Sequence, residues 1–374
     1  MTRHSKLLDF YRNSLWYLDY YFFRLFNLFW KKKFPEKIDK ILVIELDNIG
    51  DIIVTTPTIR TLSQYFNIKI DVMVKPNMVD VLSGNPNINK ILPYGLKEID
   101  KNYNKILLEI KDKYDLGVIL HHGTKKVSKL LLDANVNYRI GCTRPNIRMG
   151  KGFFLHKKTK PSFRLKHKIE DNLDTVRIIG VNLDDRYPEL YSDKKSDKFI
   201  EDLLKKNGVK EKDLLVIIHA APQYYTHKWV NKRFAEVADF LVDDYNAKII
   251  FSGEYKDIEL NNEIISLMKN GALNFAGKTK LKEFFALIKM SDLVISVDTS
   301  AMHIASAFDL PVIALFGAGN PIIWRPYCDN CRVLYKKDSE CVSCMKHICD
   351  KNLECMKVIQ VDDVINAIKE ILDR

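Results

Sequence analysis

The sequence predicts an α/β protein that carries a doubly wound parallel sheet in each half of its 374 residues. Short apolar runs rich in β-branched residues, such as 41–46 and 293–297, have the composition of strands that are covered on both faces. These runs alternate with longer stretches of helical character, which is the order expected of β-α-β units. The alternation starts twice, and the length allows two domains.

The first half begins with a strand at 41–46. A helix follows at 56–65, because Pro57 suits a first helical turn. The other elements expected in this half are strands at 70–74, 116–120 and 138–142 and helices at 103–112 and 171–179.

The second half repeats the pattern with strands at 214–219, 248–252, 293–297 and 310–316, and helices at 234–244 and 258–268. The polar, Lys-rich stretch 192–212 is interpreted as the boundary between the halves. The predicted divisions are therefore a segment 1–37, a first domain 38–195, and a second domain 196–374 with a Cys-rich segment 328–355 and a terminal helix.

The composition is that of a globular protein, with 47% hydrophobic and 29% charged residues. The formal net charge of +11 favours an anionic partner such as nucleic acid, anionic lipid or a nucleotide-sugar. Lys and Arg are scattered along the chain instead of forming one block, which argues against nucleic-acid binding.

The N-terminal segment is rich in aromatic residues, with eleven between Phe10 and Trp30. Charged residues interrupt it, so it lacks the roughly 18 uninterrupted apolar residues of a spanning helix. Lysines occupy positions 31–33. We expect residues 7–33 to lie on an anionic membrane surface, which makes the protein cytoplasmic and peripheral on the inner face of the membrane. The alternative is a helix packed on the protein itself or on a partner subunit.

Six of the seven cysteines lie between 328 and 355, in the pattern C-x2-C followed by C-x2-C-x4-C-x5-C. The first residues do not form a secretory signal, which indicates a reducing compartment and disfavours disulfides. Such thiols can hold zinc or an iron–sulfur centre, or they can stay free or redox-sensitive. The candidate cluster consists of Cys341, Cys344, Cys349 and Cys355.

The strongest candidate site follows the strand at 293–297. Asp298 stands where the strand ends, and Thr299 and Ser300 are suited to cap the short helix that carries His303. A carboxylate and free backbone N–H groups at the carboxyl end of a parallel strand form a site for a sugar-phosphate ligand.

A second candidate follows the first strand, where Asn48 and Gly50 form a turn that leads to Asp51. The Asp51 carboxylate is suited to take a proton from an attacking hydroxyl as a general base. Its alternative role is to cap the following helix.

The strand ends of the second half add further candidates. Lys228 follows the strand at 214–219 and can neutralise a leaving diphosphate, or it is an ordinary surface lysine. The turn at 252–257 supplies a carboxylate that can bind a ribose diol. Walker, G-x-S-x-G and H-E-x-x-H motifs are absent, which disfavours kinase, serine-hydrolase and zincin functions.

Residues 38–370 resemble glycosyltransferase family 9, the ADP-heptose:lipopolysaccharide heptosyltransferases. The similarity is carried by 41–57, by Asn85-Pro86, by the stretch from 275 through 298–303 to 315–317, and by the cysteine pattern at 341–356. The resemblance implies a GT-B fold, in which two Rossmann-like domains face a central cleft. It also implies metal-independent, inverting transfer, with the acceptor mainly on the first domain and the nucleotide-sugar on the second.

The resemblance also implies roles for single residues. Asp51 corresponds to the base, with Asn48 and Gly50 in the acceptor-side turn. Asp298 corresponds to a contact with the donor sugar. The other donor-binding residues are Thr299, Ser300 and His303 at the diphosphate and Asp257 at the nucleoside.

Several positions depart from the family pattern. Ser300 replaces a usual glycine, and so does Ala221. His227 stands where the family has lysine, and Lys228 comes one residue later. Either can reach a diphosphate, and Lys228 is favoured because it is charged at neutral pH.

The sequence therefore predicts an inverting glycosyltransferase that moves a sugar, with heptose from ADP-heptose as the expected donor, to a lipopolysaccharide-core or related glycan acceptor. It predicts no required cofactor and no nucleic-acid partner. The alternatives are a nucleotide-sugar-binding subunit without transfer activity and a nucleotide-sugar epimerase.

Overall fold

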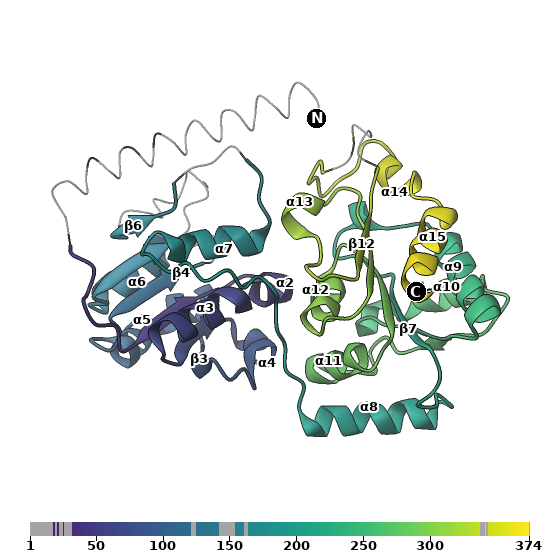
Figure 1. The fold of residues 1–374 in the computed structure, drawn as a ribbon, viewed down its shortest axis with the longest axis horizontal. Coiled ribbons are helices and arrows are strands. Elements are labelled where there is room, and N and C mark those ends of the chain that lie inside the picture. The colour runs from purple at the N-terminus through teal and green to yellow at the C-terminus, as the bar shows by residue number, and fades with distance from the viewer. Residues whose placement is uncertain are drawn as a thin grey trace. The chain divides into compact units, whose positions relative to one another are not determined.

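Two parallel six-stranded sheets form the framework of the protein in its computed structural model. The structure describes Leu18, Tyr21, Leu25 and residues 32–120, 125–141, 154–160, 164–336, 341 and 343–373. Each sheet belongs to its own unit, and the chain passes from the first unit to the second between Arg186 and Tyr187. Figure 1 labels the elements of both.

The N-terminal unit has the strand order β3-β2-β1-β4-β5-β6, with every pair parallel. Its strands are β1 (Ile41–Ile44), β2 (Ile70–Val74), β3 (Ile88–Pro93), β4 (Leu116–Ile119), β5 (Tyr138–Gly141) and β6 (Lys157–Lys158). Its helices are α2 (Ile49–Ile53), α3 (Thr56–Phe66), η1 (Pro76–Met78), α4 (Val79–Leu82), α5 (Leu96–Ile110), α6 (Lys125–Asp133) and α7 (Lys168–Arg177). Helix α5 packs beside α6, and α3 packs beside α7.

The C-terminal unit has the order β12-β11-β10-β7-β8-β9, again all parallel. Its strands are β7 (Leu215–His219), β8 (Lys248–Phe251), β9 (Leu273–Asn274), β10 (Leu293–Val297), β11 (Val312–Leu315) and β12 (Cys331–Leu334). In Figure 1, α11 and α12 lie on one side of this sheet and α9, α10 and α15 on the other.

The helices of this unit are α8 (Lys194–Lys206), η3 (Tyr225–His227), α9 (Asn231–Tyr245), η4 (Tyr255–Asp257), α10 (Ile258–Ser266), α11 (Leu281–Lys289), α12 (Ser300–Ala307), α13 (Pro321–Trp324), α14 (Glu354–Lys357) and α15 (Val361–Leu372). The doubly wound class predicted from the sequence is confirmed in both halves. A parallel sheet covered by helices on both faces explains why β1 and β10 are fully buried apolar runs.

Residues 194–206 form a helix, α8, within the stretch interpreted as the domain boundary. Asp193 caps the helix by accepting a hydrogen bond from the Ser196 N–H at 2.8 Å, and Ile200 and Leu204 are buried on one face. On α11, the helix that packs against α8, Lys289 forms an ion pair with Asp197 at 3.1 Å. Helix α8 packs against α11 and so belongs to the C-terminal unit. The chain divides after Arg186, which precedes the predicted boundary at 195.

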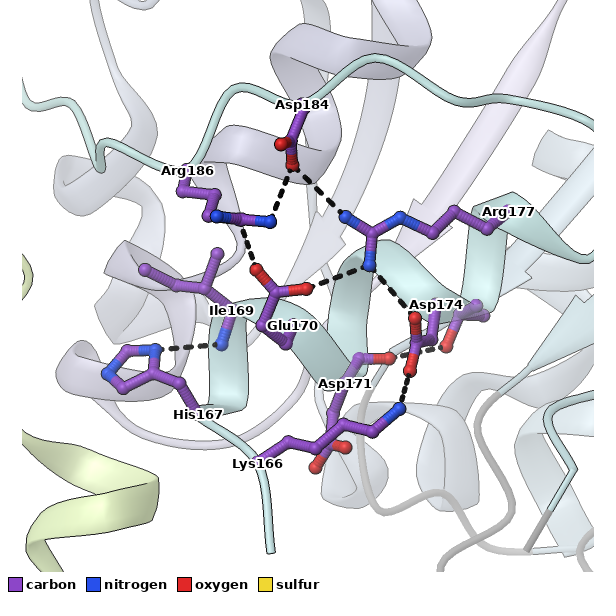
Figure 2. A network of polar contacts seen from close by, with 10 residues as sticks. Lys166, His167, Ile169, Glu170, Asp171, Asp174, Arg177, Asp184 and Arg186 are labelled. Atoms are coloured by element: carbon purple, nitrogen blue, oxygen red, sulfur yellow. Dashed lines mark hydrogen bonds and ion pairs between the residues drawn. The ribbon is translucent and has the colours of Figure 1, made fainter. Parts of the chain in front are cut away.

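A network of ion pairs fixes the end of the N-terminal unit (Figure 2). Arg177, at the end of α7, donates to Glu170 at 2.8 Å and to Asp174 at 2.9 Å, and it also pairs with Asp184. Arg186 binds Glu170 and Asp184 in turn. The two arginines thus tie the chain that leaves the unit back to α7.

The predicted membrane-surface segment falls mostly outside the described residues. Leu18, Tyr21 and Leu25 are described, lie in a helix, and are 65%, 56% and 61% exposed. Within the described part of the chain, no helix has both the length and the apolar character that a membrane span needs.

Candidate functional site

The strand order of each sheet reverses at one position, and ligands of open α/β sheets bind at the carboxyl ends of the strands beside that position. In the C-terminal unit the reversal lies between β7 and β10, which run in register with Ser296 opposite His219. In the N-terminal unit it lies between β1 and β4. Asp298 follows β10 and Asp51 follows β1, so both predicted carboxylates occur at a switch point.

The turn from β10 into α12 is fixed by side-chain hydrogen bonds. Thr299 has an extended backbone at the N-cap, and its hydroxyl accepts from the Ala301 N–H at 3.4 Å. The same hydroxyl contacts the Ser296 hydroxyl at 3.0 Å. A helix leaves its first N–H groups without intrahelical acceptors, so the start of α12, with Ser300 in its first turn, is suited to an anion.

Asp298 is held in a buried position beside His227. The His227 Nδ1 lies 3.6 Å from the Asp298 carboxylate and 3.3 Å from its carbonyl oxygen. Burial raises the pKa of Asp298 to about 7. Burial also lowers the pKa of His227, against the opposing effect of its hydrogen bond to the Asp298 backbone. Both side chains are therefore shifted toward their neutral forms.

Because Gly319 has no side chain, the Asp298 carboxylate can lie directly against it. A Cβ atom at this position would lie 1.8 Å from the Asp298 Oδ2, so any other residue would displace the carboxylate or the loop. The loop itself is held by the Cys-rich segment. Ser343 donates its N–H to the Gly317 carbonyl at 3.1 Å, and Met345 donates to the Ala318 carbonyl at 2.8 Å.

The Cys-rich segment also reaches the residues around His227. The ring of His347 lies 4.3 Å from that of Tyr224, and the Tyr224 ring lies 5.8 Å from that of His227. Lys228 follows η3, and its ammonium group has no hydrogen bond or ion pair with the described residues. The structure therefore leaves Lys228 available for an anionic ligand.

His303 and Asp257 are the other predicted donor residues. His303 lies on α12, one turn after Thr299, and is almost fully buried with its ring 6.5 Å from that of Trp324. Asp257 ends η4, and its carboxylate accepts the Glu254 N–H at 2.8 Å. Both residues thus have structural contacts in addition to the roles predicted for them.

Asp51 lies in the first turn of α2, and its carboxylate accepts the Asn48 N–H at 3.2 Å. Asn48 in turn accepts a hydrogen bond from the Lys75 ammonium at 3.2 Å. Gly50 is the second residue of the helix. The N-cap of α2 is Asn48 and not Asp51, which instead accepts the N–H of the N-cap from the third helical position. This contact is compatible with a catalytic role because a carboxylate has further acceptor positions.

Glu45 is a buried carboxyl group that the sequence analysis did not single out. It ends the apolar run of β1 and is 0% exposed. Its Oε1 accepts the Asp47 N–H at 3.1 Å, and its Oε2 has no partner among the described residues. Burial raises the pKa of Glu45 well above its usual value, against the attraction of Lys168. The sequence signal that could have identified Glu45 is its position as an acidic residue between two apolar residues, Ile44 and Leu46.

His219 is a second strand-end residue to which the sequence assigned no role. It ends β7, and its Nδ1 lies 3.0 Å from the Ser252 hydroxyl at the end of β8. Burial lowers the pKa of His219 to about 4, so the ring is neutral at physiological pH. It therefore ties two strand ends together without adding a charge to the site.

The six cysteines that the structure describes fall into two groups. Cys328 and Cys331 form a disulfide, so the expectation that disulfides are disfavoured is wrong for this pair, whose Cα atoms are 5.5 Å apart. Cys344, Cys349 and Cys355 have free thiols, and the Cys341 Sγ lies 3.9 Å from the Glu354 carboxylate. Burial, with the neighbouring thiols, raises the pKa of Cys355 to about 11. Among the described residues no three potential ligands are gathered as a metal site would require.

Comparisons with known proteins decide the family. Residues 105–353 match the model of glycosyltransferase family 9 (heptosyltransferase). The chain belongs to glycosyltransferase family 9. It is 29% identical to lipopolysaccharide heptosyltransferase 3 of Escherichia coli K12, over 86% of this chain and 95% of that protein. The resemblance found in the sequence is confirmed, and the protein is a glycosyltransferase.

Solved structures support the GT-B-like fold of this family member. A glycosyltransferase of family 9 from Veillonella parvula matches with a TM-score of 0.79 and 22% identity, over 91% of this chain and 99% of the other. The E. coli ADP-heptose lipopolysaccharide heptosyltransferase II matches with a TM-score of 0.72 and 21% identity, over 89% and 98% of the two chains.

Proposed function

We propose that this family 9 glycosyltransferase transfers a heptose from ADP-heptose to a lipopolysaccharide-core acceptor with inversion at the anomeric carbon. The observation that carries the donor assignment is the buried carboxyl group of Asp298, which lies beside the N-terminus of α12 at the switch point of the C-terminal sheet. The names of the relatives, which include lipopolysaccharide heptosyltransferase 3, support the substrate class.

The donor is proposed to bind to the C-terminal unit through its diphosphate. The first N–H groups of α12 bind the phosphate oxygens, and the hydroxyls of Thr299 and Ser300 lie in the same turn. Lys228 places its charge on the diphosphate, where negative charge grows as the leaving group departs. Asp298 binds hydroxyl groups of the sugar, and its raised pKa allows it to donate as well as accept a hydrogen bond.

The acceptor hydroxyl is proposed to be activated by Asp51 in the N-terminal unit. The hydroxyl oxygen attacks the anomeric carbon while its proton passes to the Asp51 carboxylate. The bond from the anomeric carbon to the phosphate oxygen breaks, and ADP leaves with the electron pair. Attack from the face opposite the leaving group inverts the anomeric carbon, and no metal takes part in this proposal.

Calorimetric titration with ADP, UDP, GDP and CDP in the presence of a chelator tests the donor assignment. We expect selective binding of ADP and a loss of at least about tenfold in Lys228→Ala, which removes a charge from the diphosphate. Asp298→Ala should instead weaken the binding of ADP-heptose relative to ADP, because Asp298 is proposed to contact the transferred sugar. Preference for another nucleotide would reject ADP-heptose as donor. Binding of none would instead support a role without transfer activity.

The N-terminal segment is proposed to hold the enzyme on an anionic membrane, beside its lipid-linked acceptor. Leu18, Tyr21 and Leu25 are spaced i, i+3 and i+7, so they share one face of the helix, and all three are more than half exposed. Lys32 and Lys33 follow this stretch and are charged partners for anionic head groups.

A further inference from the structure

The exposed ring of Tyr255 lies on the same edge of the C-terminal sheet as Asp298. The neighbouring strands β10, β7 and β8 pair Ile295 with Ile218 and Ile218 with Phe251. Asp298 directly follows β10, and Tyr255 begins η4 four residues after the end of β8, so both lie beyond the carboxyl edge of the same sheet. Adjacent strands are about 4.8 Å apart, which places the end of β8 about 10 Å along the edge from that of β10.

The backbone that carries Tyr255 is anchored from two sides. Gly253, at the end of β8, accepts the Gly277 N–H at 3.0 Å, so the turn after β9 is joined to the turn after β8. Gly277 has a φ of +72°, and a Cβ built on it would lie 3.1 Å from the Tyr255 Cα and 3.3 Å from its ring. A glycine is therefore needed for the two turns to approach, and it forms a base beneath the Tyr255 ring.

The ring nevertheless remains largely uncovered. Tyr255 is 81% exposed, although its backbone is fixed as the first residue of η4. Between it and Asp298, the end of β7 carries the small residues Ala220 and Ala221, both nearly buried. Along this edge the start of α12 is thus followed by the small residues at the end of β7 and then by the aromatic ring of Tyr255.

We propose that Tyr255 stacks on the nucleobase of the donor and makes the site prefer a purine. This inference rests on the proposed function, because it needs the diphosphate to lie at α12. In doubly wound folds the pyrophosphate lies at a helix N-terminus and the ribose reaches an acidic residue of a neighbouring strand. Here Asp257 supplies that acidic residue at the end of β8, and Tyr255 is its neighbour in the same turn. Stacking on an aromatic face favours the larger ring system of a purine over a pyrimidine.

Calorimetry of the full-length protein with ADP, UDP and inorganic pyrophosphate tests the proposal. Tyr255→Ala is expected to weaken ADP binding about tenfold, within the range for loss of one base–aromatic stack. The ratio of ADP to UDP affinity should fall, while the affinity for pyrophosphate, which has no base, should stay unchanged. Tyr255→Phe should retain ADP binding because the phenyl face is kept.

The controls separate this inference from the donor assignment. Tyr65→Ala removes a ring that is 49% exposed on α3, in the other unit, and should change none of these affinities. Equal ADP binding by the wild type and Tyr255→Ala overturns the stacking role alone. Tyr225, the first residue of η3, is 65% exposed and is the rival aromatic residue, so a loss of ADP binding in Tyr225→Ala but not in Tyr255→Ala overturns the role as well. Equal losses of ADP and pyrophosphate binding in Tyr255→Ala overturn it as well, since they indicate a disturbed loop. A wild type that binds no nucleotide overturns the proposed function and this inference together.

Discussion

Asp51 combines a helix-capping contact with its proposed role as base, and substitution can separate the two. Asp51→Asn keeps a side-chain oxygen for the Asn48 N–H but cannot take a proton at neutral pH. We expect the turnover number to fall by about 10²- to 10⁴-fold, the usual contribution of a general base. The measurement is the initial rate of transfer at saturating donor, together with calorimetry of ADP, whose affinity should not change.

A matched control exists on another helix of the same unit. Glu98 occupies the equivalent position of α5 and accepts the Gly95 N–H at 2.9 Å. Glu98→Gln therefore alters a carboxylate cap away from the switch point and should leave the rate unchanged. Equal rates for the wild type and Asp51→Asn would exclude Asp51 as the base.

Gly319 supplies a second test at the scale of one residue. In Gly319→Ala the new methyl group meets the Asp298 carboxylate, so that Asp298 or the loop must move. We expect the affinity for ADP-heptose to fall by at least about tenfold, equivalent to about 1.4 kcal/mol, with a normal far-ultraviolet circular dichroism spectrum. Gly271→Ala is the control, because a Cβ there meets no atom within 4 Å. Unchanged binding in Gly319→Ala would show that Asp298 does not need its present position.

The raised pKa of Asp298 gives a pH dependence with a definite sign. Between its usual value and about 7 the folded protein holds a proton on Asp298 that the unfolded chain has released. Its contribution to stability is therefore present at pH 4 and is lost as the pH rises through about 7. In Asp298→Asn this contribution no longer depends on pH, so the unfolding free energy should decline less between pH 5 and 8. Parallel pH profiles for the two proteins in urea titrations would contradict the shift.

At the scale of single elements, the strands that could be predicted from the sequence are the mostly buried ones. The strands β1 and β10 were predicted because every residue in them is buried and all but Ser296 are apolar. The strands β3, β6, β9 and β12 were not predicted, because they are short or partly exposed and lack a continuous apolar run. The same reasoning explains α8, whose buried face is narrow within a Lys-rich stretch.

Helix α8 therefore provides an element-scale prediction. Ile200 is fully buried on this helix, and Ile200→Ala should destabilise the C-terminal unit by about 2–5 kcal/mol. Lys198→Ala changes an exposed residue of the same helix, which pairs with Asp202 at 3.0 Å, and should cost less than about 1 kcal/mol. The free energy of unfolding of each variant is measured by urea titration, in which protease cleavage within 194–206 reports the unfolding of α8. Equal stability of the two variants would mean that α8 behaves as a linker.

At the scale of the whole molecule, the sequence located the strand-end carboxylates but not their surroundings. Asp51 and Asp298 stand directly after apolar runs, so their position at a sheet edge follows from the chain order. The contact of Asp298 with Gly319 and the joining of Tyr255 to Gly277 depend on how separate loops meet. No local sequence pattern predicts these contacts. Likewise, only the structure shows that the Oε2 of Glu45 has no partner among the residues it describes.

The exposed apolar face of the N-terminal segment can be tested for binding to a membrane surface. Replacing Leu18, Tyr21 and Leu25 by serine removes the exposed apolar face and leaves the formal charge of +11 unchanged. We expect weaker binding to vesicles that contain anionic lipid, because both apolar insertion and charge attraction contribute to surface binding. Cosedimentation measures the bound fraction. Binding of the wild type should also fall at about 1 M salt, where the Debye length is near 3 Å.

Two comparisons decide what covers that face. Transfer to a water-soluble acceptor should be the same for the triple variant and the wild type, since the proposed catalytic groups lie elsewhere in the chain. If the triple variant binds vesicles as well as the wild type does, the face does not contact lipid. If the triple variant instead has a lower mass than the wild type in sedimentation equilibrium without vesicles, the face packs against a second subunit. An exposed apolar stripe is also typical of such a subunit interface.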